Sequence, residues 1–433
     1  MSGRLALHVA RSRRFWPLWG AQTFGAFNDN LFRYSLVTLA AYQGFTVFGL
    51  AREEMAPIAA TAFTLPIFLF SALSGQIADK FDRTAIMRVT KFIEIWLMAA
   101  AAAGFLLQSP MLLLAALFAM GVQTAFFIPA RNSAMPTLLE KEELVAGNAL
   151  VSGAVNVAIL AGAIGGTALV GVSWGPNAIA VALMVFALIG WLSIRQGLPA
   201  PAKNEDMTIR WNIVVVTVRM LGFVIRAPDV LRPLLAVAWF WMLAATVVTI
   251  LPLFTRDVLG ADPFVVALFQ LLFTVGAALG AVLCGVLSRG GDAAVFSLIG
   301  GIGLLVFPLD LAVYTWGMTP GETLVSVDVF VADPQNWRII ADFLAAAVCG
   351  GFFLVPVQAM AQRRADDARR GRILAASGIL NGAAASLGQF VLFGLARIDA
   401  PLHSAFLFVA AGSGAAALGI GLRLIVRARR RSA

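Results

Sequence analysis

The sequence predicts an all-α membrane protein with twelve transmembrane helices in two six-helix halves. Of its 433 residues, 60% are hydrophobic and 13% are charged, whereas about 25% are charged in an ordinary soluble domain. The apolar residues fall into twelve runs, and a helix needs roughly 20 apolar residues to cross a bilayer. Basic residues gather in alternate connections between these runs, as they do in the cytoplasmic loops of membrane proteins.

The twelve apolar runs account for most of the chain. They lie near residues 15–45, 57–78, 86–107, 110–130, 145–171, 174–194, 233–255, 263–288, 293–316, 338–361, 372–396 and 402–426. No small-residue cleavage site follows the first run, so we expect it to remain as the first span and not to be a removable signal peptide.

The basic residues predict the orientation of the chain. If the N-terminus is inside, the inner segments hold most of the 32 lysines and arginines, including Lys80 and Arg83 after the second run and Arg88 and Lys91 at the start of the third. This asymmetry predicts that both termini are cytoplasmic and that the number of spans is even. The same bias accounts for the net charge of +9, so no nucleic acid is expected as a partner.

The longest connection divides the chain. Residues 196–232 form a basic cytoplasmic linker, which predicts an N-terminal six-helix half over 1–195 and a C-terminal six-helix half over 233–433. Within the linker, Met207 to Val224 alternates basic and apolar residues, a pattern typical of a helix that lies on the inner membrane surface. Six spans, a linker and six further spans resemble the organisation of the major facilitator superfamily, which implies the major facilitator fold.

A charged motif follows the second run. Residues 75–84 read GQIADKFDRT, which resembles the inner-loop motif of that superfamily: Gly, three residues, Asp, three residues, Arg. We expect Gly75 to allow close helix contact, Asp79 to meet the positive N-terminal end of a helix from the other half, and Arg83 to pair with an acid. The predicted gating motif is therefore Gly75, Asp79, Asp82 and Arg83, and the alternative is an ordinary solvated loop.

The first run contains a group of polar side chains, Asn28, Asp29, Asn30 and Arg33. An Asp or Arg deep in hydrocarbon costs roughly 2.5–3.5 kcal/mol on insertion scales, so such residues are kept mainly where they face a cavity or a partner. Asp29 and Arg33 are four residues apart and share one face of a helix. Two interpretations stay open: an ion pair that holds the bundle together, or a substrate or coupling site.

Other polar residues lie inside the remaining runs. They are Gln123, Asn156, Gln270, Asp310, Asp342 and Asn381. Each alone is more often an interhelical hydrogen bond than a ligand contact, and Asp310 is the best candidate for a second functional site. The sequence contains no catalytic dyad, phosphate-binding glycine loop or metal-ligand cluster, so neither an enzymatic reaction nor a cofactor or metal is expected.

Seven segments carry a narrower likeness. They are FGAFNDNLF at 24–32, GQIADKFDR at 75–83, AFFIPAR at 125–131, ELVAGNAL at 143–150, WFW at 239–241, RDVLG at 256–260 and GGFFLVPV at 350–357. Together they resemble the bacterial lysophospholipid transporter family, and in particular the transporter part of proteins fused to an acyltransferase. Two positions depart from the family pattern: Arg131-Asn132 replaces a Lys-Tyr pair, and Thr246 to Thr249 replaces an intramembrane Arg of some members.

This resemblance implies a function and a set of site residues. The family imports lysophospholipids, chiefly lysophosphatidylethanolamine, from the outer to the inner leaflet of the bacterial cytoplasmic membrane by alternating access. A separate acyltransferase or acyl-activating enzyme would then act on the lipid, and the transporter is expected to be a monomer among membrane lipids. The implied substrate-binding residues are Asn28, Asp29, Asn30, Arg33, Gln123, Arg131 and Asp310. Of these, the arginines suit the phosphate because of their forked donors.

Two other functions stay open. A proton-coupled exporter of amphipathic small molecules or drugs would use the same scaffold, with Asp29 as its proton carrier. A non-transporting scaffold would instead present a lysolipid to a partner acyltransferase. In a lipid flippase, titration of Asp29 or Asp310 could couple proton flow to transport.

Overall fold

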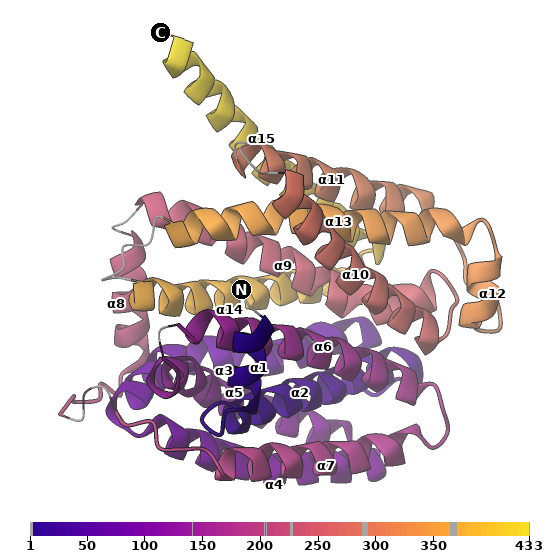
Figure 1. Cartoon of the computed structure of the whole chain (residues 1–433). Helices are drawn as coiled ribbons and strands as arrows, with labels where there is room; N and C mark the ends of the chain where they lie inside the picture. Colours follow the sequence, from indigo (N-terminus) through magenta and orange to yellow (C-terminus); the bar gives the residue numbers. More distant parts are fainter. Residues whose placement is uncertain are drawn as a thin grey trace. The chain divides into compact units, whose positions relative to one another are not determined.

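Long helices dominate the architecture (Figure 1). The structure is a computed structural model that describes residues 3–140, 142–202, 204, 206–225, 228–287, 293–363 and 370–432. Within these residues the chain forms fifteen α-helices and one isolated β-bridge, between Ala261 and Val325. Residues 203, 205, 226 and 227 of the predicted linker lie outside the described part.

Twelve of these helices have 21 residues or more. They are α2 (Trp16–Gln43), α3 (Arg52–Lys80), α4 (Arg83–Leu106), α5 (Pro110–Leu138), α6 (Leu144–Val170), α7 (Gly175–Arg195), α9 (Pro228–Asp257), α10 (Pro263–Leu287), α11 (Ala293–Tyr314), α13 (Asn336–Arg363), α14 (Arg370–Arg397) and α15 (His403–Ser432). Three helices are short: α1 (Gly3–Arg11), α8 (Ile213–Ile225) and α12 (Val327–Ala332).

The long helices fit the predicted spans. In the described part of the chain, eleven helices are long and apolar enough to cross a membrane. The other long helix is α2, which has 28 residues and a lower mean hydropathy because it contains the charged Asp29 and Arg33. The prediction of an all-α protein with many spans is confirmed.

The chain forms two compact units. The first contains Met1–Leu50 and Ala59–Met220, and the second contains Ala51–Ile58 and Leu221–Ala433. The N-terminal end of α3 is thus part of the second unit. The change from one unit to the other at residue 220 lies within the linker that the sequence predicts, while the exact half boundaries stay a prediction.

In the first unit, α2 packs along α6 and α7, and α4 packs along α5 and α7 (Figure 1). Two glycines allow the close approach of α2 and α6. A side chain at Gly162 would overlap the carbonyl oxygen of Phe27, and one at Gly166 would overlap that of Leu31. Gly165 makes only ordinary contact with Leu31, so two of the three glycines in this stretch serve the packing for which small residues are used in membranes.

In the second unit, α13 packs against α10 and α11, and α15 packs against α11. Gly280 of α10 lies against the backbone of Val348 on α13, where a side chain would overlap the carbonyl oxygen. A cluster of stacked and edge-on rings, which includes Phe254, Phe269, Phe343 and Phe406, packs these helices together.

The connection Gly317 to Trp337 between α11 and α13 is acidic and contains Glu322, Asp328 and Asp333. Its short helix α12 buries Phe330, whose ring lies 6.0 Å from that of Phe269 on α10. The backbone of Val325 pairs with Gly260 and Asp262, which fixes the start of the connection beside the end of α9.

Candidate functional site

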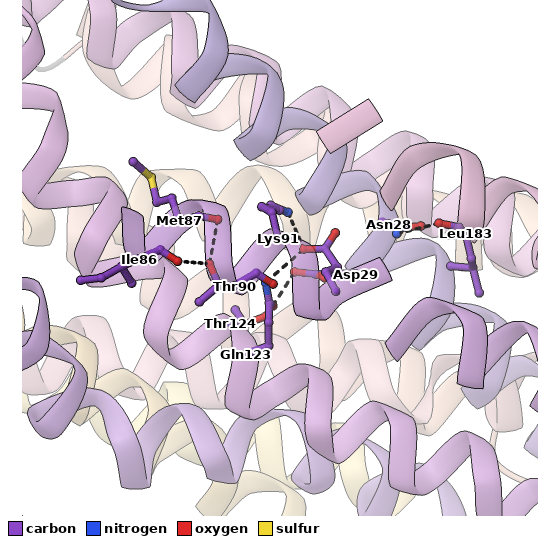
Figure 2. Close-up of polar contacts among 10 residues, drawn as sticks. Asn28, Asp29, Ile86, Met87, Thr90, Lys91, Gln123, Thr124 and Leu183 are labelled. Carbon is purple, nitrogen blue, oxygen red and sulfur yellow. Dashed lines mark hydrogen bonds and ion pairs between the residues drawn. The ribbon is translucent and has the colours of Figure 1, made fainter. Parts of the chain in front are cut away.

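The polar side chains of α2 point in different directions. Asn28 is fully buried, and its Nδ2 donates to the backbone carbonyl of Leu183 on α7 at 3.1 Å (Figure 2). Arg33 donates to Oδ1 of Asn30 at 2.9 Å. An ion pair between Asp29 and Arg33, one of the two interpretations of the sequence, is not formed among the described side chains. This leaves the Asp29 carboxylate available to other helices.

Asp29 is half-buried and faces α5. The hydroxyl of Thr124 lies 3.5 Å from Oδ2 of Asp29 and 3.3 Å from Oε1 of the adjacent Gln123. A hydroxyl carries one hydrogen and therefore donates to only one of these acceptors at a time. Figure 2 shows the three side chains close together. The Thr124 hydroxyl is thus near both Asp29 and Gln123, two of the predicted substrate-binding residues.

Gln123 also connects this group to α4. Its Nε2 donates to the backbone carbonyl of Thr90 at 3.2 Å and to Oε2 of Glu94 at 3.1 Å. The same Glu94 oxygen accepts from Nζ of Lys91 at 2.6 Å, and the two charged side chains are only 1% and 2% exposed. A buried charge without its partner is strongly unfavourable, so Lys91 and Glu94 form one structural unit.

A glycine on α2 makes room for the ammonium of Lys91. A side chain at Gly25 would overlap Nζ of Lys91. On another side of the ammonium, the ring of Phe127 on α5 lies 4.8 Å from Nζ, a cation–π contact. The absence of a side chain at Gly25 therefore determines where this positive charge sits.

We call Asp29, Lys91, Glu94, Gln123 and Thr124 the polar cluster. When all its groups are ionised, two carboxylates face one ammonium, so the cluster has an excess negative charge. Oδ1 of Asp29 and Oε1 of Glu94 are buried and have no hydrogen-bond partner among the described residues. Buried polar atoms are normally hydrogen-bonded. The cluster can therefore accept a cation that carries N–H donors.

Three members of the cluster were not predicted as site residues: Lys91, Glu94 and Thr124. Lys91 was counted only as a basic residue of the inner segments, whereas it lies two turns inside α4, in a helix able to cross a membrane. Glu94 was not selected. The available signal was an acid three residues after a base within an apolar run, because such a pair shares one helical face.

The motif after the second run anchors the N-terminal end of α4. Oδ1 of Asp82 accepts from the backbone N–H of Ala85 at 2.7 Å and caps the helix. Arg83 is buried, and its guanidinium donates to the carbonyl of Pro201 at 2.6 Å and to Oγ1 of Thr137 at 3.2 Å. Among the described residues, Arg83 therefore bonds to neutral groups and not to the acid that was expected.

The other two motif residues make fewer contacts. A side chain at Gly75 would meet no described atom within 4 Å, and the close helix contact expected at Gly75 stays a prediction. The backbone carbonyl of Asp79 accepts from the N–H of Asn204 at 3.0 Å. The motif thus ties the chain that follows α7 to the ends of α3 and α4.

Two predicted substrate-binding residues have hydrogen-bond partners outside the polar cluster. Arg131 donates twice to Oδ1 of the adjacent Asn132, at 3.0 and 2.6 Å. Asp310 belongs to the second unit, where both of its carboxylate oxygens accept from Arg338, at 2.6 and 3.0 Å. In the part of the chain that is described, no group of three or more His, Cys, Asp or Glu side chains is arranged to hold a metal ion.

Comparison with known families decides the class of the protein. Residues 18–388 match the Major Facilitator Superfamily. The chain belongs to this superfamily. As a member of the major facilitator superfamily it is a multi-pass membrane transporter and not an enzyme, and the predicted major facilitator fold is confirmed.

Individual relatives share about a quarter of their residues with this chain. The lysophospholipid transporter LplT of Serratia proteamaculans is 25% identical over 350 residues, which are 79% of this chain and 78% of the relative. The LplT of Photorhabdus laumondii is 25% identical over 352 residues, with the same coverage. These similarities extend across both compact units.

Solved structures share the fold. A crystal structure of the peptide transporter POT in complex with alafosfalin superimposes with a TM-score of 0.68 at 16% identity and covers 99% of this chain and 98% of that one. An inward-facing, unoccupied bacterial homologue of the human lysosomal transporter Spinster gives 0.62 at 16% identity, covering 93% and 94%.

Proposed function

We propose that this transporter moves lysophospholipids, in particular lysophosphatidylethanolamine, from the outer to the inner leaflet of the bacterial cytoplasmic membrane. The observation that carries the proposal is the polar cluster, in which the Asp29 carboxylate of α2 lies beside the Lys91–Glu94 pair of the membrane-length helix α4 and two carboxylate oxygens lack partners among the described residues. The 25% identity to lysophospholipid transporters supports the same class of substrate.

The charges of the cluster suit a zwitterionic head group. An ethanolamine ammonium has three N–H donors and would satisfy the unpartnered oxygens of Asp29 and Glu94. Its charge would also offset the excess negative charge of the cluster. Arg33 lies one helical turn from Asp29 on α2, where its guanidinium could bind the phosphate of the same head group. A quaternary choline has no N–H donor, so it would leave the two oxygens unpaired.

The remaining parts of the proposal concern the whole chain. Transport would proceed by alternating access, with Gly75, Asp79, Asp82 and Arg83 controlling the inner end of the helices and both termini in the cytoplasm. The acyl chain would stay in apolar surroundings while the head group crosses. A separate acyltransferase or acyl-activating enzyme would then use the imported lipid.

Uptake by spheroplasts that lack their own transporter tests the function. Labelled lysophosphatidylethanolamine is supplied to spheroplasts with the wild type, with Asp29→Asn, or with Glu322→Gln, which neutralises an exposed carboxylate in the acidic connection. The three proteins are compared at matched expression. We expect the wild type and Glu322→Gln to import the lipid alike. Asp29→Asn should import it about tenfold less or worse, because a hydrogen bond to a charged group contributes about 1.5–3 kcal/mol.

The same assay separates the competing functions. No uptake above background by well-expressed wild type would overturn the flippase. Protection of such cells against toxic amphiphiles would then point to an exporter. Uptake that is unchanged in Asp29→Asn would leave a lipid transporter but remove the head group from the polar cluster. A scaffold predicts no transport and a reacylation that Asp29→Asn does not alter.

A further inference from the structure

The second compact unit contains a cavity with a single ionisable side chain. The cavity has a volume of about 60 Å³ and is lined by residues of α9, α10, α11, α13 and α15. All of its lining side chains are apolar except that of Asp342 on α13. Asp342 is 6% exposed, and its Oδ2 has no hydrogen-bond partner among the described residues. A carboxyl group in this position is not explained by packing.

The nearest base is already occupied. The guanidinium of Arg338, one turn before Asp342 on α13, donates to both carboxylate oxygens of Asp310 on α11 at 2.6 and 3.0 Å. The carboxyl group of Asp342 lies beside that of Asp310. Two ionised carboxylates can only accept hydrogen bonds and repel each other, so this arrangement favours a proton on one of the two groups. One guanidinium thus serves two neighbouring carboxyl groups.

The size and lining of the cavity restrict its ligand. A calcium or magnesium ion needs about six or more oxygen ligands, and the lining supplies the side-chain oxygens of Asp342 alone. A buried water needs 2–4 polar partners, which the apolar walls do not offer. A proton requires only the carboxylate. We propose that Asp342 binds and releases a proton during the transport cycle, with Asp310 connecting it to the aqueous end of the helices.

The surroundings of Asp342 contain few charges. Asp310 faces it from α11 and Arg338 from its own helix, and the guanidinium of Arg338 lies 4.6 Å from the ring centre of Tyr314 of α11. The lining from α9, α10 and α15 is apolar, and Asp328 of α12 is exposed. Protonation of Asp342 is therefore governed by the Asp310–Arg338 pair.

Exposure falls stepwise along this group. The Arg338 side chain is 54% exposed, that of Asp310 is 33% exposed, and Asp342 is 6% exposed. A proton from water forms an O–H bond at Asp310 and then at Asp342 as the first bond breaks, and no electrons are transferred. Conformational change that wets the cavity from the other side would release it. A lipid moved in the same cycle is then coupled to the proton gradient.

A transport assay tests the coupling and rests on the proposed function. Purified protein in liposomes takes up labelled lysophosphatidylethanolamine either at equal pH or with the outside about one pH unit more acidic, which supports at most about tenfold accumulation for one proton per lipid. We expect the gradient to raise accumulation by wild type and by the control Asp328→Asn. Asp342→Asn should keep exchange at equal pH and lose the response to the gradient. A response of Asp342→Asn equal to that of the wild type would overturn the proposal.

A second measurement needs no substrate. The infrared band of protonated carboxyl groups is titrated in wild type, Asp342→Asn and Asp328→Asn. We expect a titrating carboxyl signal in wild type and Asp328→Asn that is missing in Asp342→Asn, with partial recovery in Asp342→Glu. An unchanged titration in Asp342→Asn refutes proton binding by this residue even if the transporter moves no lysolipid. Failure of lipid exchange at equal pH, by contrast, counts against the proposed function alone.

Discussion

Nζ of Lys91 lies 2.6 Å from Oε2 of Glu94 within a membrane-spanning helix, and neither side chain is more than 2% exposed. Removing both charges from water is costly, and the mutual attraction offsets that cost only while both partners are present. Gln123 adds a hydrogen bond to the same oxygen. The pair is therefore expected to behave as one unit when it is mutated.

A double-mutant comparison tests this unit. Lys91→Met alone leaves Glu94 as an unpaired buried carboxylate and is expected to cost about 3–5 kcal/mol of stability. Adding Glu94→Gln removes that charge, so the double variant should be more stable than Lys91→Met. The measurement is thermal unfolding of the purified proteins in one detergent. Glu94→Gln alone is measured as well. If the stability lost by the double variant equals the sum of the stabilities lost by Lys91→Met and by Glu94→Gln, the two side chains do not interact in the folded protein.

Gly25→Ala is expected to reduce transport because the new methyl group overlaps the ammonium of Lys91. The end of a lysine side chain can move, so the protein should still fold while its polar cluster is displaced. Uptake of labelled lysophosphatidylethanolamine at matched expression measures the effect. Gly165→Ala is the matched control, since the nearest atom to its added Cβ is Cδ1 of Leu31 at 3.7 Å. Equal uptake by both variants would show that the position of Lys91 does not matter.

The spans were predictable because the thickness of the bilayer imposes them. The run predicted at 15–45 became α2 (Trp16–Gln43), and the run at 372–396 became α14 (Arg370–Arg397). Helix ends differ by a few residues, since end groups such as the Asp82 cap are decided locally. Asp29 was predictable for a related reason. A charge in hydrocarbon is costly whichever way the helix is rotated, so an Asp within an apolar run indicates a functional or paired residue.

The partners of Asp29 were not predictable in the same way. Thr124 lies 95 positions along the chain, and the contact depends on how α2 and α5 are rotated about their axes. Lys91 was hidden because it follows Arg88 near the start of a span, where a base is ordinary. Arg83 was expected to pair with an acid because of its motif. In the structure its guanidinium donates to the carbonyl of Pro201.

Asp262 is expected to make the folding stability of the protein depend on pH. It lies between α9 and α10, outside both spans, and burial raises the pKa of its carboxyl, with a smaller rise from Asp328. The folded state therefore keeps this proton to a higher pH than the unfolded chain. Stability should fall as pH rises from the ordinary pKa of the group through the raised one.

Asp262→Asn isolates this effect. The variant keeps an Oδ1 acceptor for the N–H groups of Phe264 and Val265 but cannot ionise. We expect it to be more stable than wild type at neutral pH, with the difference shrinking as the pH is lowered to about 4. Thermal unfolding at several pH values measures it. A difference that grows on acidification would mean that the carboxylate is favoured in the folded state.

Close packing of α2 and α6 depends on Gly162, and a second glycine of the same helix provides the comparison. A Cβ at Gly162 would overlap the carbonyl oxygen of Phe27 and lie 3.0 Å from the amide nitrogen of Leu31, whereas one at Gly153 would meet no described atom within 4 Å. Backbone atoms cannot move aside as a flexible side chain can, so Gly162→Ala should cost about 1–3 kcal/mol. Gly153→Ala should be neutral or stabilising by up to about 1 kcal/mol, because Ala favours the helix. Thermal unfolding of both variants measures the contrast, and equal stability would mean that α2 and α6 are farther apart in the membrane.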